Sequence, residues 1–423
     1  MRKGRISQTD EKKKSEDSLT KGFKIVNLHK EKVNIQRENR KKELSEEYEE
    51  DSNYRRFRPI ILCLIISLIL IFIFSFIYFG PLIGISLNRN VGINEEKRID
   101  IVSTDSDIYD TYCSDLLIYS NQKITTYNTR GVKNWEYSLP SQFTPNIYIQ
   151  DRFMAITNNS NGKIYLFENK KEILNTKIDG EINEIFLDEN GNIAVEYSTS
   201  GYKKVLGIYS KKGKNLYNVY LSSDPIVDVK LLENAKKLLI FQTNTTSFKV
   251  GMSISSVDSA NESQINEIAT LDNNFIYDLT IQGRNIIMLL DDKITKCNMD
   301  TGEVTDIYSF DTNQLMFISL SDNYYTMISK ELNEQNQSKY SITSNRFDNT
   351  KISSLELADS PKLMENSNVV NYLVFQDSIK VVNKWGVEVK NTNIEFPPKE
   401  AVIFNNSKSL ALIYTNKVYV VNI

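Results

Sequence analysis

The residues that most often carry chemistry are scarce in this chain of 423 residues. The single histidine, His29, lies in a polar N-terminal stretch, so the rest of the chain lacks the usual general base and the commonest metal ligand. The cysteines Cys63, Cys113 and Cys297 have neither a zinc-ligand spacing nor the pattern of a disulfide framework. Because no Ser-His-Asp or Cys-His arrangement can form outside the N-terminal stretch, we predict that the protein is not an enzyme.

Carboxylates do occur in pairs and in short polar runs. The pairs Glu95–Glu96 and Asp291–Asp292 are adjacent in sequence, so in a strand their side chains would point to opposite faces. The runs at Asn158–Lys163 and Asp188–Asn192 have the composition of calcium loops but not the EF-hand spacing. We interpret all of these residues as turn or linker residues. The sequence therefore predicts no catalytic residue, no metal site and no cofactor.

The elements that would position any site are short strands. From residue 97 onwards apolar and polar residues alternate in short runs, and Asn, Gly, Asp or Ser turns separate them. Four such strands recur every 36–50 residues, the period of one blade of a β-propeller. We predict an all-β, eight-bladed β-propeller, with seven blades as the alternative. The units begin near Asp107, Asn146, Glu181, Pro225, Asn274, Gln314, Pro361 and Lys399.

The two ends of this region complement each other. The eighth unit stops at Ile423 with only three strands, while a spare strand at Lys97–Thr104 precedes the first unit. If that spare strand joins the last blade, the ring closes and no open sheet edge remains between its ends. We therefore predict a propeller over residues 97–423 that is closed by residues 97–104.

A glycine marks the last turn of four units. The positions are Gly131, Gly213, Gly302 and Gly386, where a hairpin turn needs positive φ. Four residues after these glycines, Trp135 and Tyr217 are aromatic but Asp306 is not, and the second tryptophan, Trp385, precedes its glycine. We predict that Trp135 fills space between blades and does not line a binding pocket.

This pattern of strand, turn, strand and "D/N-x-x-G-x-x-x-W" resembles the repeat of quinoprotein-type propellers. The resemblance implies a calcium-bound quinone at the ring centre, with carboxylate, amide and tryptophan side chains around it. The chain has two tryptophans and no adjacent cysteines, so we expect the fold without the cofactor. The whole layout also resembles a family of uncharacterised, membrane-anchored extracellular propellers from low-GC Gram-positive bacteria.

One segment predicts membrane anchoring. Ile60–Phe79 is a run of twenty uncharged residues, long enough to span the hydrocarbon core of a bilayer as a helix. Arg55, Arg56 and Arg58 precede it, so the positive-inside rule places the N-terminus in the cytoplasm and the propeller outside the cell. We expect residues 1–58 to be a disordered cytoplasmic arm, 59–80 a signal-anchor helix in contact with the lipid bilayer, and 81–96 a linker.

The net charge has opposite signs before and after the apolar segment. Residues 1–58 carry 17 Lys and Arg against 12 Asp and Glu, a net charge of +5, which leaves −8 for the remainder of a chain with a total of −3. An acidic body argues against binding of nucleic acid. We predict an extracellular binding or scaffold module for a protein or cell-wall partner. The alternatives are a transmembrane sensor that relays ligand binding to the arm, and a surface enzyme that uses carboxylates in the propeller channel.

Overall fold

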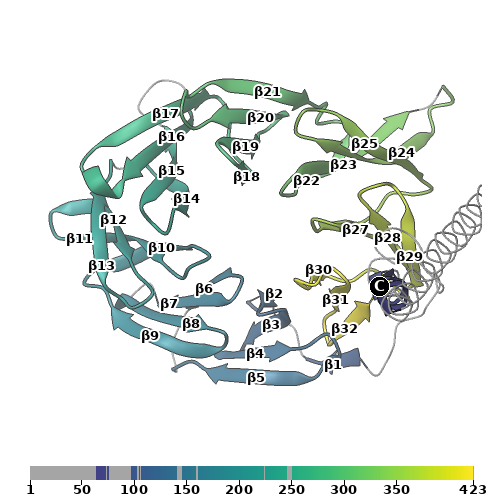
Figure 1. Ribbon diagram of the computed structural model, residues 1–423, viewed down its shortest axis with the longest axis horizontal. Helices are drawn as coiled ribbons and strands as arrows, with labels where there is room; N and C mark the ends of the chain where they lie inside the picture. Colours follow the sequence, from purple (N-terminus) through teal and green to yellow (C-terminus); the bar gives the residue numbers. More distant parts are fainter. Residues whose placement is uncertain are drawn as a thin grey trace, which may run out of the picture. The chain divides into compact units, whose positions relative to one another are not determined.

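Eight four-stranded antiparallel sheets surround a common centre and form the propeller (Figure 1). The structure is a computed structural model that describes residues 63–72, 74–75, 97–101, 104, 106–140, 145–158, 161–222, 224–244, 250–332 and 334–422. The observed sheets begin within a few residues of the predicted unit starts. The prediction of eight blades is confirmed, and the seven-blade alternative is wrong.

Within each blade the strands follow one another from the centre of the ring outwards. The innermost strands are β2 (Ile108–Tyr112), β6 (Pro145–Gln150), β10 (Glu181–Leu187), β14 (Ile226–Leu232), β18 (Asp278–Gln282), β22 (Leu315–Leu320), β26 (Leu363–Asn366) and β30 (Glu400–Ile403). The second strands are β3 (Asp115–Ser120), β7 (Phe153–Asn158), β11 (Ile193–Thr199), β15 (Lys237–Asn244), β19 (Asn285–Leu289), β23 (Tyr324–Leu332), β27 (Val370–Val374) and β31 (Ser409–Ile413).

The outer half of each blade continues the same order. The third strands are β4 (Lys123–Tyr127), β8 (Lys163–Glu168), β12 (Tyr202–Tyr209), β16 (Gly251–Asp258), β20 (Lys293–Asn298), β24 (Ser338–Arg346), β28 (Ser378–Asn383) and β32 (Lys417–Asn422). The outermost strands of the first seven blades are β5 (Lys133–Ser138), β9 (Lys171–Lys177), β13 (Asn215–Tyr220), β17 (Ile265–Asp272), β21 (Val304–Ser309), β25 (Lys351–Leu357) and β29 (Glu388–Asn393).

The eighth blade is completed from the other end of the chain. Its outermost strand is β1 (Arg98–Asp100), which pairs antiparallel with β32 so that Ile99 lies opposite Val418. Ile99 is 4% exposed and packs in one apolar cluster with Leu116 and Ile118 of the first blade. The predicted ring closure by residues 97–104 is therefore confirmed, although the strand itself is only three residues long.

Stacking of the blades explains why the middle strands carry continuous apolar runs. The second strand of the second blade, β7, is buried at all six positions, because a neighbouring sheet covers each of its faces. The outer strand β5 instead alternates between exposed and partly buried residues. Burial of both faces makes the blades depend on one another for stability, since one isolated sheet would expose these apolar side chains.

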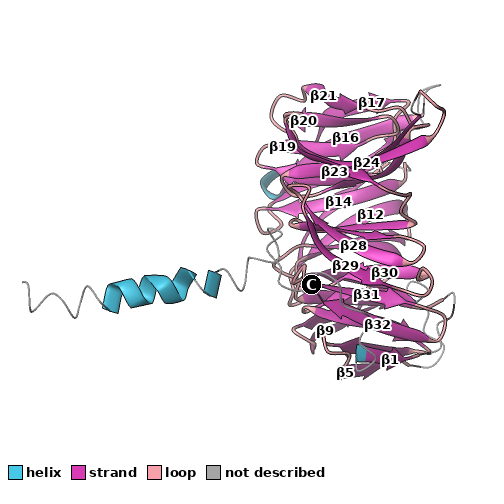
Figure 2. Cartoon of the chain, turned by 90° about the vertical axis from the view of Figure 1, so that its right-hand side faces the viewer, coloured by secondary structure: helices cyan, strands magenta, loops and turns pink. Residues whose placement is uncertain are grey.

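The turns divide the ring into two faces, seen edge-on in Figure 2. The turn face carries the hairpins that join the first strand to the second and the third to the outermost strand. The connection face carries the hairpins between second and third strands together with the links from blade to blade. These names are kept below. Both faces consist of short turns and loops, as expected for a propeller.

The repeated glycines adopt the predicted backbone conformation. Gly131, Gly213, Gly302 and Gly386 have φ values of 76°, 76°, 70° and 77° in the turn before the outermost strand. In the first blade the side chain of Asn128 fixes this turn, because its Oδ1 accepts a hydrogen bond from the backbone N–H of Arg130 at 2.9 Å. An asparagine three residues before the glycine and the glycine itself thus act as one turn motif.

The N-terminal part of the chain is a separate compact unit and is described only in a short helical stretch. Residues 63–72 and 74–75 are helical, and within the described residues no helix has the length and apolarity needed to cross a membrane. The whole predicted arm 1–58, both ends of Ile60–Phe79 and the linker 81–96 lie outside the described residues. The membrane segment and the three domain boundaries stay predictions.

Candidate functional site

Trp135, the aromatic residue that the sequence singles out, lies between the first two blades. Its ring meets Phe167 of the second blade edge to face at 5.8 Å and Tyr112 of its own blade at 6.3 Å, and it stacks on Tyr137 at 6.1 Å. These contacts belong to one apolar cluster that spans both blades. The packing role predicted for Trp135 is confirmed.

The residue at the position equivalent to Trp135 differs in type from blade to blade, and in two further blades it contacts the following blade. Tyr217 is 6% exposed, and its hydroxyl donates to the carbonyl oxygen of Ala235 in the next blade at 2.7 Å. In the seventh blade the position is Lys390, whose buried ammonium group donates to the carbonyl oxygen of Asn422 in the eighth blade. The side chain at this position thus repeatedly reaches the following blade. Asp306 departs from this pattern and forms an ion pair with Lys293 of its own blade at 3.2 Å.

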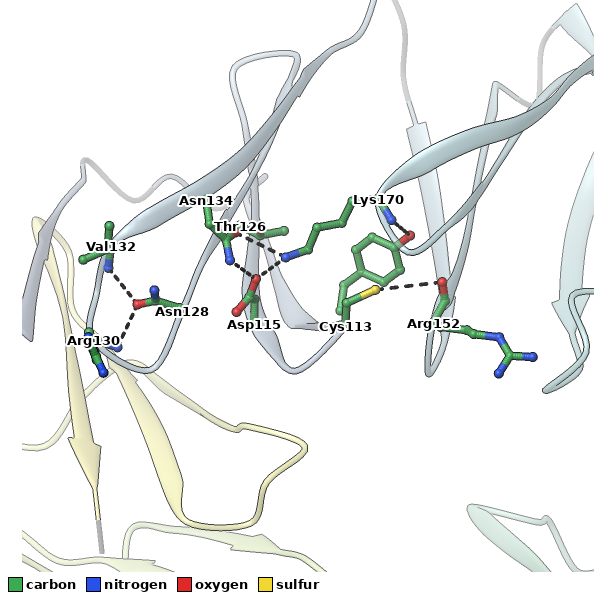
Figure 3. Close-up of polar contacts among 10 residues, drawn as sticks. Cys113, Asp115, Thr126, Asn128, Arg130, Val132, Asn134, Arg152 and Lys170 are labelled. Atoms are coloured by element: carbon green, nitrogen blue, oxygen red, sulfur yellow. Dashed lines mark hydrogen bonds and ion pairs between the residues drawn. The ribbon is translucent and has the colours of Figure 1, made fainter.

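A polar network that includes Asn134, the residue before Trp135 in the sequence, joins the first two blades (Figure 3). Asp115 is 7% exposed and forms an ion pair with Lys170, and it also accepts a hydrogen bond from the side chain of Asn134. Asn134 Oδ1 accepts from the hydroxyl of Thr126 at 2.6 Å. The backbone N–H of Lys170 donates to the hydroxyl of Tyr112 at 2.8 Å. Because each group already has a partner, the network serves to hold the blades together.

The three cysteines are free thiols, of which Cys63 is exposed, Cys113 is half-buried and Cys297 is buried. Cys113 lies at the first-to-second turn of its blade, where its Sγ is 3.9 Å from the carbonyl oxygen of Arg152 (Figure 3). Burial raises the pKa of the Cys113 thiol and that of the Cys297 thiol, which keeps both protonated at neutral pH. The two cysteines of the propeller are therefore weak nucleophiles.

The acidic pairs and runs noted in the sequence have structural partners. Asp291 lies in a hairpin turn, and its carboxylate accepts hydrogen bonds from the N–H of Phe275 and the hydroxyl of Tyr277. Asp188 accepts from the N–H of Asn190 and from the N–H and side-chain amide of Asn192. Both are turn residues, as predicted. Glu95–Glu96 and part of Asn158–Lys163 lie outside the described residues.

Carboxylates gather instead on the strands at the centre of the ring. The eight innermost strands carry one lysine, Lys230, against seven carboxylates, so the channel they surround is acidic. The seven carboxylates are Asp110, Glu181, Glu184, Asp228, Asp278, Glu365 and Glu400.

The channel carboxylates influence one another across blade boundaries. Burial raises the pKa of Glu365 to about 7, and the charge of Glu400 in the next blade adds to that increase. The pKa of Glu400 is itself raised by burial and by Asp110 of the first blade. Elsewhere around the ring, the pKa of Glu184 is raised first by burial and then by the charges of Glu196 and Asp228. Glu184, Glu365 and Glu400 are thus less acidic than in water, mainly because burial disfavours the charged form and secondly because neighbouring carboxylates repel it.

A polar cavity at the ring centre is lined by the turn-face ends of the innermost strands of the sixth, seventh and eighth blades and by the first residues of β18 in the fifth blade. It has a volume of about 400 Å³, and Asp278, Asp322, Asn366 and Asn368 contribute polar groups to its wall. The side-chain amide of Asn368 donates to the carboxylate of Asp322, whose own backbone N–H donates to Asn368 Oδ1 at 3.1 Å. The amide nitrogen of Asn366 is buried and has no hydrogen-bond partner among the described residues. A water or ligand oxygen would satisfy this donor.

The arrangement does not fit the calcium-bound quinone that the sequence resemblance implies. Among the described residues no three His, Cys, Asp or Glu side chains are close enough to hold a metal ion. Trp135 is on an outermost strand and Trp385 is in a third-to-outermost turn, so neither can stack on a cofactor at the ring centre. We derive no chemistry through such a group.

The inner carboxylates are the residues that the sequence reading missed. A signal was present, because the first strand of several units places one acid inside an apolar run, as in "IYDTY", "IVDVK" and "LMEN". Such an acid breaks the apolar pattern expected for a strand whose two faces pack against other sheets. What was not visible in the sequence is that the strands that carry these acids lie together at the centre of the ring.

Known proteins show what this fold is similar to. The C-terminal WD40 domain of Sif2 superposes with a TM-score of 0.51, at 11% identity, over 80% of this chain and 99% of that chain. BamB from Moraxella catarrhalis gives a TM-score of 0.45 at 10% identity, over 78% and 100%. At these identities the likeness concerns the propeller fold alone. No match is found among the curated proteins. A family model does match residues 88–423, and the chain therefore belongs to DUF5711, a family of unknown function.

Proposed function

We propose that this protein is a membrane-tethered extracellular binding module that holds a positively charged segment of a partner at the mouth of its channel on the turn face. The observation that carries the proposal is the cavity of about 400 Å³ at this mouth, to which four consecutive blades contribute. Its acidic and amide side chains offer hydrogen-bond acceptors that are held in place by contacts between blades. A lysine or arginine side chain supplies the complementary donors.

Electrostatics support a cationic partner. The inner strands have an excess of six carboxylates over lysine. Burial raises the pKa of Glu365 and of Glu400, and the charge of a neighbouring carboxylate adds to each increase. A bound cation would offset this repulsion and favour the ionised carboxylates. The same field would increase the rate at which a basic segment associates, particularly at low salt.

The tether is proposed from the twenty apolar residues Ile60–Phe79 and the arginines before them. Treatment of intact cells with protease should remove the propeller while an epitope at the N-terminus survives. The variant Leu68→Arg and Ile69→Arg should no longer anchor the chain, because two charges at the centre of the segment are costly in a bilayer. An N-terminus that is cleaved from outside, or a propeller that resists protease on intact cells, would contradict the proposed topology.

The binding test uses a defined basic probe. A fluorescent tetralysine peptide should bind the full chain, and the double variant Asp278→Asn and Asp322→Asn should weaken that binding about tenfold. Asp300→Asn is the matched control, because Asp300 is an exposed acid on the same face that pairs with Arg284. Binding should also weaken with added salt. If the double variant and the control bind tetralysine with equal affinity, the binding site is not at the channel mouth.

A second candidate function rests on Glu365 and Glu400. A carboxyl group with a pKa of about 7 beside a second carboxyl resembles the acid and base pair of hydrolases. If the channel hydrolyses a cell-surface polymer, Glu365→Gln should abolish the activity and weaken binding of tetralysine far less than the double variant Asp278→Asn and Asp322→Asn does. Absence of any glutamate-dependent hydrolysis of isolated cell-wall material would remove this candidate.

A further inference from the structure

A second cavity lies on the connection face between the seventh and eighth blades, away from the channel mouth. It has a volume of about 330 Å³. One wall comes from the link that follows β29, including Glu395 and Phe396, and the other from the hairpin of β31 and β32, including Tyr414, Lys417 and Tyr419. This cavity shares no residue with the site proposed above.

Three aromatic rings form adjoining walls that stand nearly at right angles. The rings of Phe396 and Tyr414 are 5.1 Å apart with an interplanar angle of 82°. Those of Tyr414 and Tyr419 are 6.0 Å apart at 78°. Tyr414 and Tyr419 are each 5% exposed and so are held by the core, whereas Phe396 is 47% exposed and forms the open side. Rings that stand perpendicular to one another direct several π-faces toward the same cavity.

A cation of the chain itself already lies against these rings. The ammonium group of Lys417 is 4.8 Å from the ring centre of Tyr419 and 6.0 Å from that of Tyr414, and it donates a hydrogen bond to the Tyr419 hydroxyl at 3.1 Å. Glu395 places a carboxylate at the same cavity. π-faces together with one negative charge are the surroundings that favour an organic cation over a neutral group.

We propose that this aromatic box, made of Phe396, Tyr414, Tyr419 and Glu395, binds an organic ammonium group, and that Lys417 occupies the box in the absence of ligand. The ligand class is an alkylammonium or quaternary ammonium group, either on a small molecule or displayed on a polymer. Lys417 moves aside when such a group enters, so it acts as a weak internal competitor. The proposal does not depend on the function proposed for the channel mouth.

Cavities at equivalent places between other blades lack this chemistry. The cavity between the fifth and sixth blades is lined by Tyr308 and Phe310, but no perpendicular pair of these rings is recorded among the described residues, and its Lys339 forms an ion pair with Glu356 at 3.0 Å. The cavity between the second and third blades is lined by Tyr197, Tyr209 and the acidic Asp179, but among the described residues no pair of perpendicular rings is recorded between its two tyrosines. The box is therefore not a general consequence of how blades meet.

The test compares choline with its neutral carbon isostere, 3,3-dimethyl-1-butanol, by ligand-detected NMR on the full chain. Choline should bind about tenfold more tightly, which corresponds to the cation–π preference of a partly desolvated site. Phe396→Leu should reduce choline binding about fivefold, because it removes one π-face and keeps the apolar volume. Lys417→Gln should increase choline affinity about threefold by removing the competitor.

Two controls keep the result specific to the box. Lys384→Gln alters another lysine that lies over aromatic rings, 5.0 Å from Trp385, and should leave choline binding unchanged. Phe275→Leu alters a phenylalanine that is 39% exposed on another blade. Equal binding of choline and its isostere, or Lys417→Gln with unchanged or lower choline affinity, would overturn the proposal. If Phe396→Leu fails to fold, the effect of Lys417→Gln on choline affinity alone tests the proposal.

Discussion

Single glycines set how closely one blade approaches the blade before it. A Cβ added to Gly302 would lie 2.2 Å from the carbonyl oxygen of Ile268 on the outermost strand of the preceding blade. A Cβ on Gly213 would lie 2.8 Å from the Leu174 side chain, again on the preceding blade. The glycine therefore serves two needs at one position, since it permits positive φ and leaves room for the neighbouring sheet.

Gly302→Ala should destabilise the protein more than positive φ alone explains. We expect the free energy of unfolding to fall by about 3 kcal/mol, of which strain in the left-handed region accounts for about 1 kcal/mol. Gly283→Ala is the control, because Gly283 has φ of 59° and nothing lies within 4 Å of the added Cβ. Urea unfolding of both variants measures the difference. Equal losses would show that the blades adjust freely at this contact.

The two tryptophans should differ in their effect on stability. Trp135→Ala removes the ring that packs between two blades and should lower the free energy of unfolding by about 3 kcal/mol. Trp385 is 48% exposed, and Trp385→Ala should change stability by less than about 0.5 kcal/mol. Thermal unfolding of both variants tests this. A stable Trp135→Ala protein that has lost a binding activity would show instead that Trp135 lines a binding pocket.

At the scale of elements, the three-residue strand β1 is the one that closes the ring. β1 contributes three residues to the sheet, yet it joins the two ends of the ring. Its central residue, Ile99, is buried among side chains of the eighth and first blades. Among the described residues, the N-terminal strand closes the ring with three backbone pairs, the buried Ile99 and the partly buried Ile101, so the seam should be sensitive to small changes.

Ile99→Asp should open the seam. The substitution puts an unpaired carboxylate into an apolar cluster, which costs about 3 kcal/mol or more. We expect faster hydrogen exchange of the amides of β32, whereas β11 and β15 keep their protection. Arg98→Ala is the control, because Arg98 is exposed and faces away from this cluster. Unchanged exchange in β32 would mean that β1 does not hold the ring closed.

At the scale of the whole molecule, closure concentrates negative charge at the centre. Glu365, Glu400 and Asp110 belong to three blades that are successive around the ring but lie at opposite ends of the sequence. The fold thus keeps these carboxyl groups close together although each would ionise more readily in water. This cost is expected where the channel serves binding or chemistry.

The free energy of unfolding should depend on pH because of these channel carboxyl groups. Since the folded pKa of Glu365 is about 7 and its unfolded value is near 4.5, the folded state retains a proton that the unfolded state loses between these values. Stability therefore falls as pH rises from about 4.5 to 7 and is constant above. Glu365→Gln should match the wild type at pH 4 and exceed it by about 2 kcal/mol at pH 8, allowing for solvent screening in the channel.

Chemical denaturation at the two pH values measures this difference. Glu267→Gln, on the exposed side of the outer strand β17, is the control and should show the same small effect at both. A Glu365→Gln variant that gains nothing at high pH would show that Glu365 is ionised in the folded protein at neutral pH.

Much of the architecture could be predicted because it depends on local patterns. Alternation of apolar and polar residues identifies strands, turn residues separate them, and a fixed period of four strands indicates blades. The glycine turns and the spare strand at Lys97–Thr104 followed from the same reasoning. Each of these features is decided within a few residues of the chain, or by counting the repeats.

The sequence by itself therefore determined the blades, their number to within one, and the way the ring closes. Only the tertiary structure decided which side chains meet, because those contacts join residues from different blades. The acidic channel brings Glu365 and Glu400 near Asp110, and the aromatic box combines Phe396 with Tyr414 and Tyr419. Such meetings depend on the stagger and tilt between sheets, which a local pattern of alternation does not encode.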